Sequence, residues 1–254
     1  MTRPWNSAHN AYVSHDYSLL VFWSQKAAYS ATTHWFSSSI ANVSMRPTLF
    51  RTTDYCIPYQ EAMQYVDKGY STVFVCRNPY KRSVSAYINK FYFHPEYGKF
   101  DRFDKLEVFS KPLYRVSNLA NPFLGWSFDQ YLRTVRLQMF KFPVINGHWE
   151  TQIPRSNTRR FEADFLVRVE NYTEDLLHVI DSLQLPAYEP TVSNRTAYEA
   201  GFRESADLLD KISSLQLLQE GVALRPHNLL SADAKALIRY LYAEDFEYFG
   251  YNSN

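Results

Sequence analysis

The sequence predicts an α/β fold, a three-layer α/β/α arrangement around a central parallel sheet, and three apolar runs carry this expectation. Each run has the length and composition of a buried strand, and a stretch with helical periodicity follows it. The runs lie at 19–23, 72–76 and 165–169. Because strands that alternate with helices pair in parallel, helices are expected on both faces of the sheet. The 254 residues suit one large domain, 1–254, with two small domains as the alternative.

The second apolar run leads into the clearest helix. Asn78 suits the N-cap and Pro79 the first helical position. Apolar side chains then recur at helical spacing and predict a stripe that faces the core, made of Tyr80, Val84, Tyr87, Ile88 and Phe91. The opposite side of this helix is expected to carry Asn78, Arg82, Ser85 and Asn89.

Further helices are predicted from caps and periodicity. Ser127 precedes a helix over 128–138, with Gln130 in the capping-box position. Another helix is expected over 173–183. The last begins near Ser231 and continues through ADAKALIRYLYAEDF, with core contacts expected at Leu237, Tyr240, Leu241 and Phe246. Residues 92–126 lack clear periodicity and suggest a long irregular excursion of the kind that covers an active site.

Composition narrows the class of protein. A net charge near +1 gives no basic field of the kind that binds nucleic acid. The aromatic content of 17% fits core packing, or in part a stacking surface for a base or a sugar. Two cysteines, Cys56 and Cys76, do not make a disulfide scaffold. The N-terminal stretch lacks the apolar segment of a signal peptide, and no run reaches the roughly 18 apolar residues of a membrane span. A cytoplasmic protein without membrane insertion is therefore expected.

The most informative local feature is the spacing between Arg77 and Ser85. Arg77 follows an apolar strand and Ser85 lies on the helix that comes next, so both are expected near one strand end. A guanidinium, a hydroxyl and a helix start form a set that binds anions, and a phosphate monoester suits them.

A second turn of this kind follows the first strand, in FWSQKAAYSATTHWF (22–36). Lys26 supplies a cation, the small Ala27 and Ala28 allow close approach to backbone N–H groups, and hydroxyls follow at Ser30, Thr32 and Thr33. Taken alone, this loop is equally compatible with a polar turn capped by Ser30. Since ligands of open α/β sheets bind at the carboxyl ends of the strands, the two turns together suggest one ligand with two anionic groups.

Nucleoside triphosphatases fit this pattern poorly. A Walker A loop requires glycines, and 22–36 contains none. A Walker B strand ends in a carboxylate that helps to hold magnesium. The corresponding predicted strand here, 72–76, is followed by Arg77. The sequence therefore predicts a site without a metal ion.

Five segments, taken in order, resemble the carbohydrate (Golgi-type, family 2) sulfotransferases that use 3′-phosphoadenosine 5′-phosphosulfate (PAPS). RNPYKRSVSAYINKF resembles their RDPxxRxVSAYxNKF segment with Asn78 in place of Asp, and QKAAYSA resembles their PKxxxTS loop with Gln25 in place of Pro and Ser30 in place of Thr. NGHWETQ (146–152) is similar to their HW-x-x-Q segment. FLVRVENYTEDL (165–176) and LYAEDFEYFGY (241–251) resemble later parts of the family pattern.

The resemblance implies a fold related to nucleotide kinases, with a P-loop-like turn and site residues at matching positions. The 5′-phosphosulfate is expected on the loop formed by Gln25, Lys26, Ala27, Ala28, Tyr29, Ser30 and Ala31. The 3′-phosphate is expected on Arg77 and Ser85, with Arg195 as a weaker candidate for contact with the donor. Lys26 would also stabilise charge on the leaving phosphate. The product of the donor is then 3′,5′-adenosine diphosphate.

Three residues are candidates for the base that takes the proton of the acceptor hydroxyl. His148 is preferred because histidine titrates near neutral pH, although a structural place for it is equally compatible. His34 is the second candidate. Glu150 is the third, and the alternative role for Glu150 is to orient His148. The basic run of Arg155, Arg159 and Arg160 suits a solvated face or an anion contact.

The expected function is transfer of a sulfuryl group from PAPS to a hydroxyl of a carbohydrate or a small molecule. A kinase-like phosphoryl transferase is the alternative within enzymes. A non-catalytic nucleotide-binding module is the alternative outside them.

Overall fold

The computed structural model describes residues 10–92, 126–142, 146–153, 161–190 and 202–253. The chain divides into two compact units, each made of two segments of sequence. The first unit comprises Met1–Asn78 with Glu150–Arg195, and the second comprises Pro79–Trp149 with Thr196–Asn254. The expectation of one domain over 1–254 stays a prediction.

The first unit is built on a five-stranded sheet with the strand order β3-β1-β2-β4-β5. Its strands are β1 (Asn10–Ser14), β2 (Leu19–Trp23), β3 (Cys56–Pro58), β4 (Ser71–Cys76) and β5 (Phe165–Arg168). The three predicted strands are β2, β4 and β5, and they pair in parallel. The sheet is nevertheless mixed, because β1 runs antiparallel to both β2 and β3. The α/β prediction is confirmed, and β1 and β3 are additions to it.

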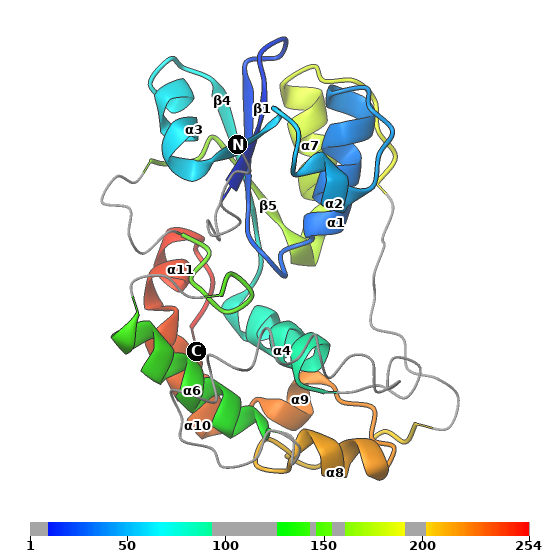
Figure 1. The fold of residues 1–254 in the computed structure, drawn as a ribbon, viewed down its shortest axis with the longest axis vertical. Coiled ribbons are helices and arrows are strands. Elements are labelled where there is room, and N and C mark those ends of the chain that lie inside the picture. The colour runs from blue at the N-terminus through cyan, green and yellow to red at the C-terminus, as the bar shows by residue number, and fades with distance from the viewer. Residues whose placement is uncertain (1–9, 93–125, 143–145, 154–160, 191–201, 254) are drawn as a thin grey trace. The chain divides into compact units, whose positions relative to one another are not determined.

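Helices cover both faces of this sheet (Figure 1). The first unit contains α1 (Tyr29–Trp35), a π-helical turn η1 (Phe36–Ile40), α2 (Pro47–Phe50), α3 (Tyr59–Val66), a 3₁₀ turn η4 (Val169–Asn171) and α7 (Tyr172–Ser182). Side chains alternate along β2, so Val21 and Trp23 join the cluster with Trp35 of α1, while Phe22 packs on Tyr59 of α3 with ring centroids 5.2 Å apart. Burial of both faces explains why β2 is apolar at every position.

The amino-terminal edges of β4 and β5 are joined by a reciprocal contact. The Asp164 carboxylate accepts hydrogen bonds from the Thr72 backbone N–H at 2.7 Å and from the Thr72 hydroxyl at 2.8 Å. The same hydroxyl accepts a bond from the Asp164 N–H at 2.9 Å. These bonds set the register in which Val73 pairs with Phe165.

The second unit is helical in the part of the chain that the structure describes. It contains α4 (Pro79–Lys90), α6 (Phe128–Lys141), α8 (Ser214–Gln219), α9 (Pro226–Leu229), α10 (Ala232–Leu241) and α11 (Ala243–Tyr248). The predicted stripe of α4 lies in the core of this unit. Arg82, expected on the side of α4 opposite the core stripe, is only 2% exposed and donates to the Gly147 carbonyl at 3.0 Å.

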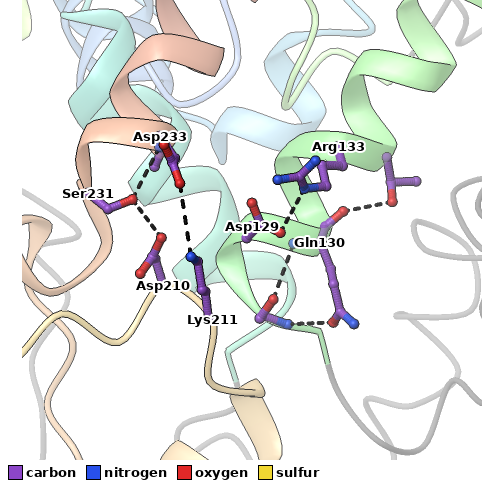
Figure 2. A network of polar contacts seen from close by, with 10 residues as sticks. Asp129, Gln130, Arg133, Asp210, Lys211, Ser231 and Asp233 are labelled. Atoms are coloured by element: carbon purple, nitrogen blue, oxygen red, sulfur yellow. Dashed lines mark hydrogen bonds and ion pairs between the residues drawn. The ribbon is translucent and has the colours of Figure 1, made fainter.

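Polar contacts define the helix starts of this unit (Figure 2). The Ser127 hydroxyl accepts from the Gln130 N–H at 3.2 Å and the Gln130 side chain accepts from the Ser127 N–H at 3.0 Å, which confirms the predicted capping box. Ser231 caps α10 and also donates to the Asp210 carboxylate at 2.6 Å. These bonds satisfy backbone donors that a helix start would otherwise leave without partners.

The C-terminal helix differs from the expectation in two respects. It is interrupted at Tyr242, where φ of −122° and ψ of 29° separate α10 from α11. Tyr240, expected in the core, is 57% exposed and lies beneath the Arg136 guanidinium, which is 5.1 Å from its ring centroid. Leu241 and Phe246 are buried as expected. The buried positions of α10 are Ala234, Ile238 and Leu241, and Tyr240, two residues after Ile238, lies on the other side of this helix.

Two further expectations concern the excursion over 92–126 and membrane-spanning segments. Of the excursion predicted over 92–126, residues 93–125 lie outside the described residues. Across the described parts of the chain, no helix combines the length and the apolar character that a bilayer crossing requires.

Candidate functional site

The candidate site of the first unit begins where its parallel strands end. Trp23 of β2 pairs with Val75 of β4, and Cys76 of β4 pairs with Arg168 of β5. The segments that follow the three strands therefore leave the sheet at one edge, the carboxyl edge at which α/β proteins bind ligands. They bring the loop of Lys26, the backbone of Arg77 and the turn of Glu170 to this edge.

The loop after β2 has a left-handed backbone without any glycine. Lys26 has φ of 68° and Ala28 has φ of 50°, and the Ala27 N–H donates to the Ser24 carbonyl at 3.3 Å. Each such residue costs about 1–2 kcal/mol relative to right-handed backbone. Turns with left-handed residues can direct successive N–H groups toward an anion.

The hydroxyls of this loop are placed differently from the sequence expectation. α1 starts at Tyr29 after Ala28, so Ser30 lies inside the helix and does not cap it. Thr32 and Thr33 are buried. The Thr33 hydroxyl donates to the Tyr29 carbonyl at 2.8 Å and lies 2.6 Å from the Tyr12 hydroxyl. These two threonines hold α1 against the core of the unit.

Tyr12 is a neutral partner in this contact. Burial raises the pKa of its hydroxyl far above the usual value for tyrosine, and the hydrogen bond with Thr33 only partly opposes this. The Tyr12–Thr33 pair is therefore uncharged at neutral pH.

Arg77 is bonded directly to the loop that carries Lys26. Its Nη1 donates to the Lys26 carbonyl at 3.1 Å, and the Arg77 side chain is half-buried. Two cationic residues from neighbouring strand ends are thus joined in one unit. A ligand with several negative charges suits this arrangement.

Two polar side chains hold the backbone where β4 ends. The Glu170 carboxylate accepts from the Asn78 N–H at 3.2 and 3.4 Å, which makes Glu170 a backbone cap. The amide of Gln152, which is fully buried, exchanges two hydrogen bonds with the Arg77 backbone. Gln152 belongs to the HW-x-x-Q segment, but no local pattern predicted a role for it.

His148 lies in the second unit, and its contact with Asn146 defines which ring nitrogen carries the proton. The His148 backbone N–H donates to Asn146 Oδ1 at 3.0 Å, which identifies that atom as the amide oxygen. The His148 Nδ1 lies 2.6 Å from the same oxygen and must therefore carry a proton. In the neutral ring the lone pair is then on Nε2, the atom that could accept a proton from a substrate.

The other candidates occupy varied positions. His34 is exposed on α1, with Nδ1 2.9 Å from the Tyr188 hydroxyl, and Glu150 is 5% exposed in the first unit. Ser85 is half-buried on α4 in the second unit. Arg195, with the basic run Arg155, Arg159 and Arg160, lies outside the described residues.

Within the described ranges no group of three or more His, Cys, Asp or Glu side chains could hold a metal ion.

The left-handed loop leads to a stability prediction. Ala28→Gly should raise the free energy of unfolding by up to about 1 kcal/mol, because relief of left-handed strain exceeds the extra entropy of the unfolded chain. Ala27→Gly is the matched control, since Ala27 is buried and is not left-handed. It should lower stability by about 1 kcal/mol. Urea unfolding measures both, and equal losses would contradict the left-handed backbone at Ala28.

Comparison with known proteins agrees with this geometry. Searches of curated proteins and of solved structures returned no match. The family described as the sulfotransferase family matches residues 13–252, nearly the whole chain and both compact units. The chain therefore belongs to the sulfotransferase family.

Proposed function

We propose that this protein transfers the sulfuryl group of PAPS to a hydroxyl of a carbohydrate or small-molecule acceptor. Sulfuryl transfer follows from the family. The observation that carries the choice of donor is the bond between the Arg77 guanidinium and the Lys26 carbonyl, which joins cations from two adjacent strand ends. PAPS has anionic groups at both its 3′ and 5′ positions, and it matches this pair of cations.

The residues that are present suit such a donor. Lys26 with its loop, residues 25–31, would hold the 5′-phosphosulfate. Arg77 would hold the 3′-phosphate together with Ser85, by the resemblance of both positions to the family pattern. A guanidinium donates up to five N–H bonds, so Arg77 can donate to the Lys26 carbonyl and also to a phosphate.

The proposed reaction exchanges one S–O bond for another. The acceptor oxygen attacks sulfur, and the bond from sulfur to the 5′-phosphate oxygen breaks. The products are a sulfate ester and 3′,5′-adenosine diphosphate. Negative charge grows on the departing phosphate oxygen, where the Lys26 ammonium would stabilise it. The proton of the acceptor hydroxyl must go to a base as the new bond forms.

His148 is the proposed base. Because its Nδ1 proton is donated to Asn146, Nε2 is the ring atom with a lone pair. Asn146 would hold the ring in this tautomer and stabilise the imidazolium that forms, much as an orienting residue does in a catalytic triad. His34 is the second candidate, and its Nδ1 is in contact with the Tyr188 hydroxyl. Glu150 is the third.

Two alternatives give different results in a simple assay. A kinase-like phosphoryl transferase would require magnesium and consume ATP. A nucleotide-binding module would bind 3′,5′-adenosine diphosphate without transfer. The decisive experiment is incubation of the full chain with labelled PAPS and fractionated cell extract, with mass spectrometry of every compound that gains sulfate. No sulfated product in any fraction, with intact donor binding, would favour the module.

Loss of either cation should weaken the donor site. Lys26→Ala is expected to lower turnover by about 10²–10³, the typical effect of removing a contact with developing charge. Arg77→Ala should weaken binding of 3′,5′-adenosine diphosphate by about 10–100-fold, as for a lost charged hydrogen bond. Lys81→Ala, an exposed cation of α4, is the matched control and should change neither. Unchanged donor affinity in both site variants, measured by calorimetry, would mean that the donor site is misplaced.

Ser85 should discriminate between nucleotides. Ser85→Ala is expected to lower affinity for 3′,5′-adenosine diphosphate about 3–10-fold and to leave affinity for adenosine 5′-monophosphate unchanged, because only the first ligand has a 3′-phosphate. Asn89→Ala, on the exposed surface of the same helix, is the control. Equal weakening of both nucleotides by Ser85→Ala would rule out its assignment to the 3′-phosphate.

His148 should affect chemistry and not binding. His148→Ala is expected to bind PAPS normally and to lose turnover by about 10²–10⁴. Asn146→Ala should shift the acidic limb of the pH–rate profile toward lower pH, because loss of the acceptor at Nδ1 disfavours the imidazolium. The measurement is kcat against pH for three proteins: wild type, His148→Ala and Asn146→Ala. Full turnover in His148→Ala would exclude it as the base and make His34 the next residue to test.

A further inference from the structure

We propose that Gln152 is the positioning residue of the donor site, and this inference rests on the proposed function. Its side-chain amide would hold the end of β4 and the start of the Lys26 loop, so that both cations address one donor molecule. The residue would act through the Arg77 backbone and Ser24, without touching the substrate.

At the position where β4 leaves the sheet, the amide of Gln152 makes the hydrogen bonds that a neighbouring strand would otherwise make. The last residue pair between β4 and β5 is Cys76 with Arg168. At the next residue, the Arg77 N–H donates to Gln152 Oε1 at 2.8 Å, and Gln152 Nε2 donates to the Arg77 carbonyl at 2.9 Å. A side-chain amide has one acceptor and one donor group in a fixed plane, as a peptide group does. It can therefore continue the ladder for one residue beyond its end.

The same amide oxygen reaches the end of the neighbouring strand. The Ser24 hydroxyl, in the first residue after β2, donates to Gln152 Oε1 at 3.4 Å. Ser24 is 1% exposed and Gln152 is 0% exposed, so water cannot replace these partners. One buried group thus connects the segments from which Lys26 and Arg77 extend.

The position of the guanidinium depends on this connection. With both backbone groups of Arg77 bonded, the direction in which its side chain leaves the backbone is fixed. From there Nη1 reaches the Lys26 carbonyl at 3.1 Å and supports the left-handed residue of the loop. Loss of the amide would free the Arg77 backbone and, through it, the Lys26 loop.

The test compares two buried glutamines that have different neighbours. Gln152→Met keeps the length of the side chain and removes its hydrogen bonds. Gln138→Met is the matched control, because Gln138 is 5% exposed and its Oε1 accepts from the Trp149 indole N–H at 2.6 Å, within the helical unit. The readouts are the urea midpoint and the affinity for 3′,5′-adenosine diphosphate, measured on the full chain.

Both variants are expected to lower the urea midpoint, and Gln152→Met alone should weaken nucleotide binding about tenfold or more. In an Arg77→Ala background, Gln152→Met should weaken binding less than threefold, because the Arg77 guanidinium, through which Gln152 also holds the Lys26 loop, is already absent. A purely structural residue would give additive losses in this cycle. Additive losses, or wild-type affinity in Gln152→Met, would overturn the proposal.

Two further arms keep the outcome interpretable. If Gln152→Met does not fold, Gln152→Glu takes its place, since it keeps the acceptor for the Arg77 N–H and loses the donor to the Arg77 carbonyl; it should show the same non-additivity. Nucleotide binding by the wild-type chain separates the proposed function from the positioning role of Gln152. No binding of 3′,5′-adenosine diphosphate by wild type would overturn the proposed function together with this inference. Binding by wild type that Gln152→Met leaves unchanged would overturn the positioning alone.

Discussion

The parallel pairing of β2 with β4 is the constraint on which the candidate site depends. It brings two strand ends that are about fifty residues apart in sequence to one edge of the sheet. Buried strands of this kind cannot shift by one residue without turning core side chains to the other face. Trp23 and Val75 therefore determine where the following residues leave the sheet. The positions of Lys26 and Arg77 are consequences of packing in the core beneath them.

A strained loop and its supports belong to the same arrangement. A glycine-rich phosphate loop takes left-handed backbone at little cost, whereas Lys26 and Ala28 take it against the preference of their Cβ atoms. Such strain persists where the surroundings hold it. Here the Arg77 guanidinium bonds the carbonyl of one strained residue, and buried Thr33 ties the following helix to Tyr12. The loop is thus held by its neighbours instead of by its own composition.

Local signals predicted much of this structure, and contacts distant in sequence account for what they missed. The β2 run, the α4 stripe and the Ser127 capping box are encoded within a few residues and were predictable. Strand β3 has only three residues, and both β1 and β3 depend on pairing partners that composition does not reveal. Tyr240 is exposed because the core-facing stripe of α10 is formed by Ala234, Ile238 and Leu241, a phase that the packing of the whole helix decides. Gln152 lies 75 residues from the backbone that it bonds, so no spacing rule could assign its role.

The identity of residue 77 follows from the two demands that this position would meet. It bonds the backbone carbonyl of Lys26 and, under the proposed function, would also neutralise a phosphate. Lysine has a single ammonium on a flexible stem, and a bond to the Lys26 carbonyl would draw that charge away from a ligand. A guanidinium carries its donors on several edges of a rigid plane, so one edge can bond the loop while another faces an anion. Under the proposed function, an arginine directly after β4 would thus let one side chain both shape the loop and bind the ligand.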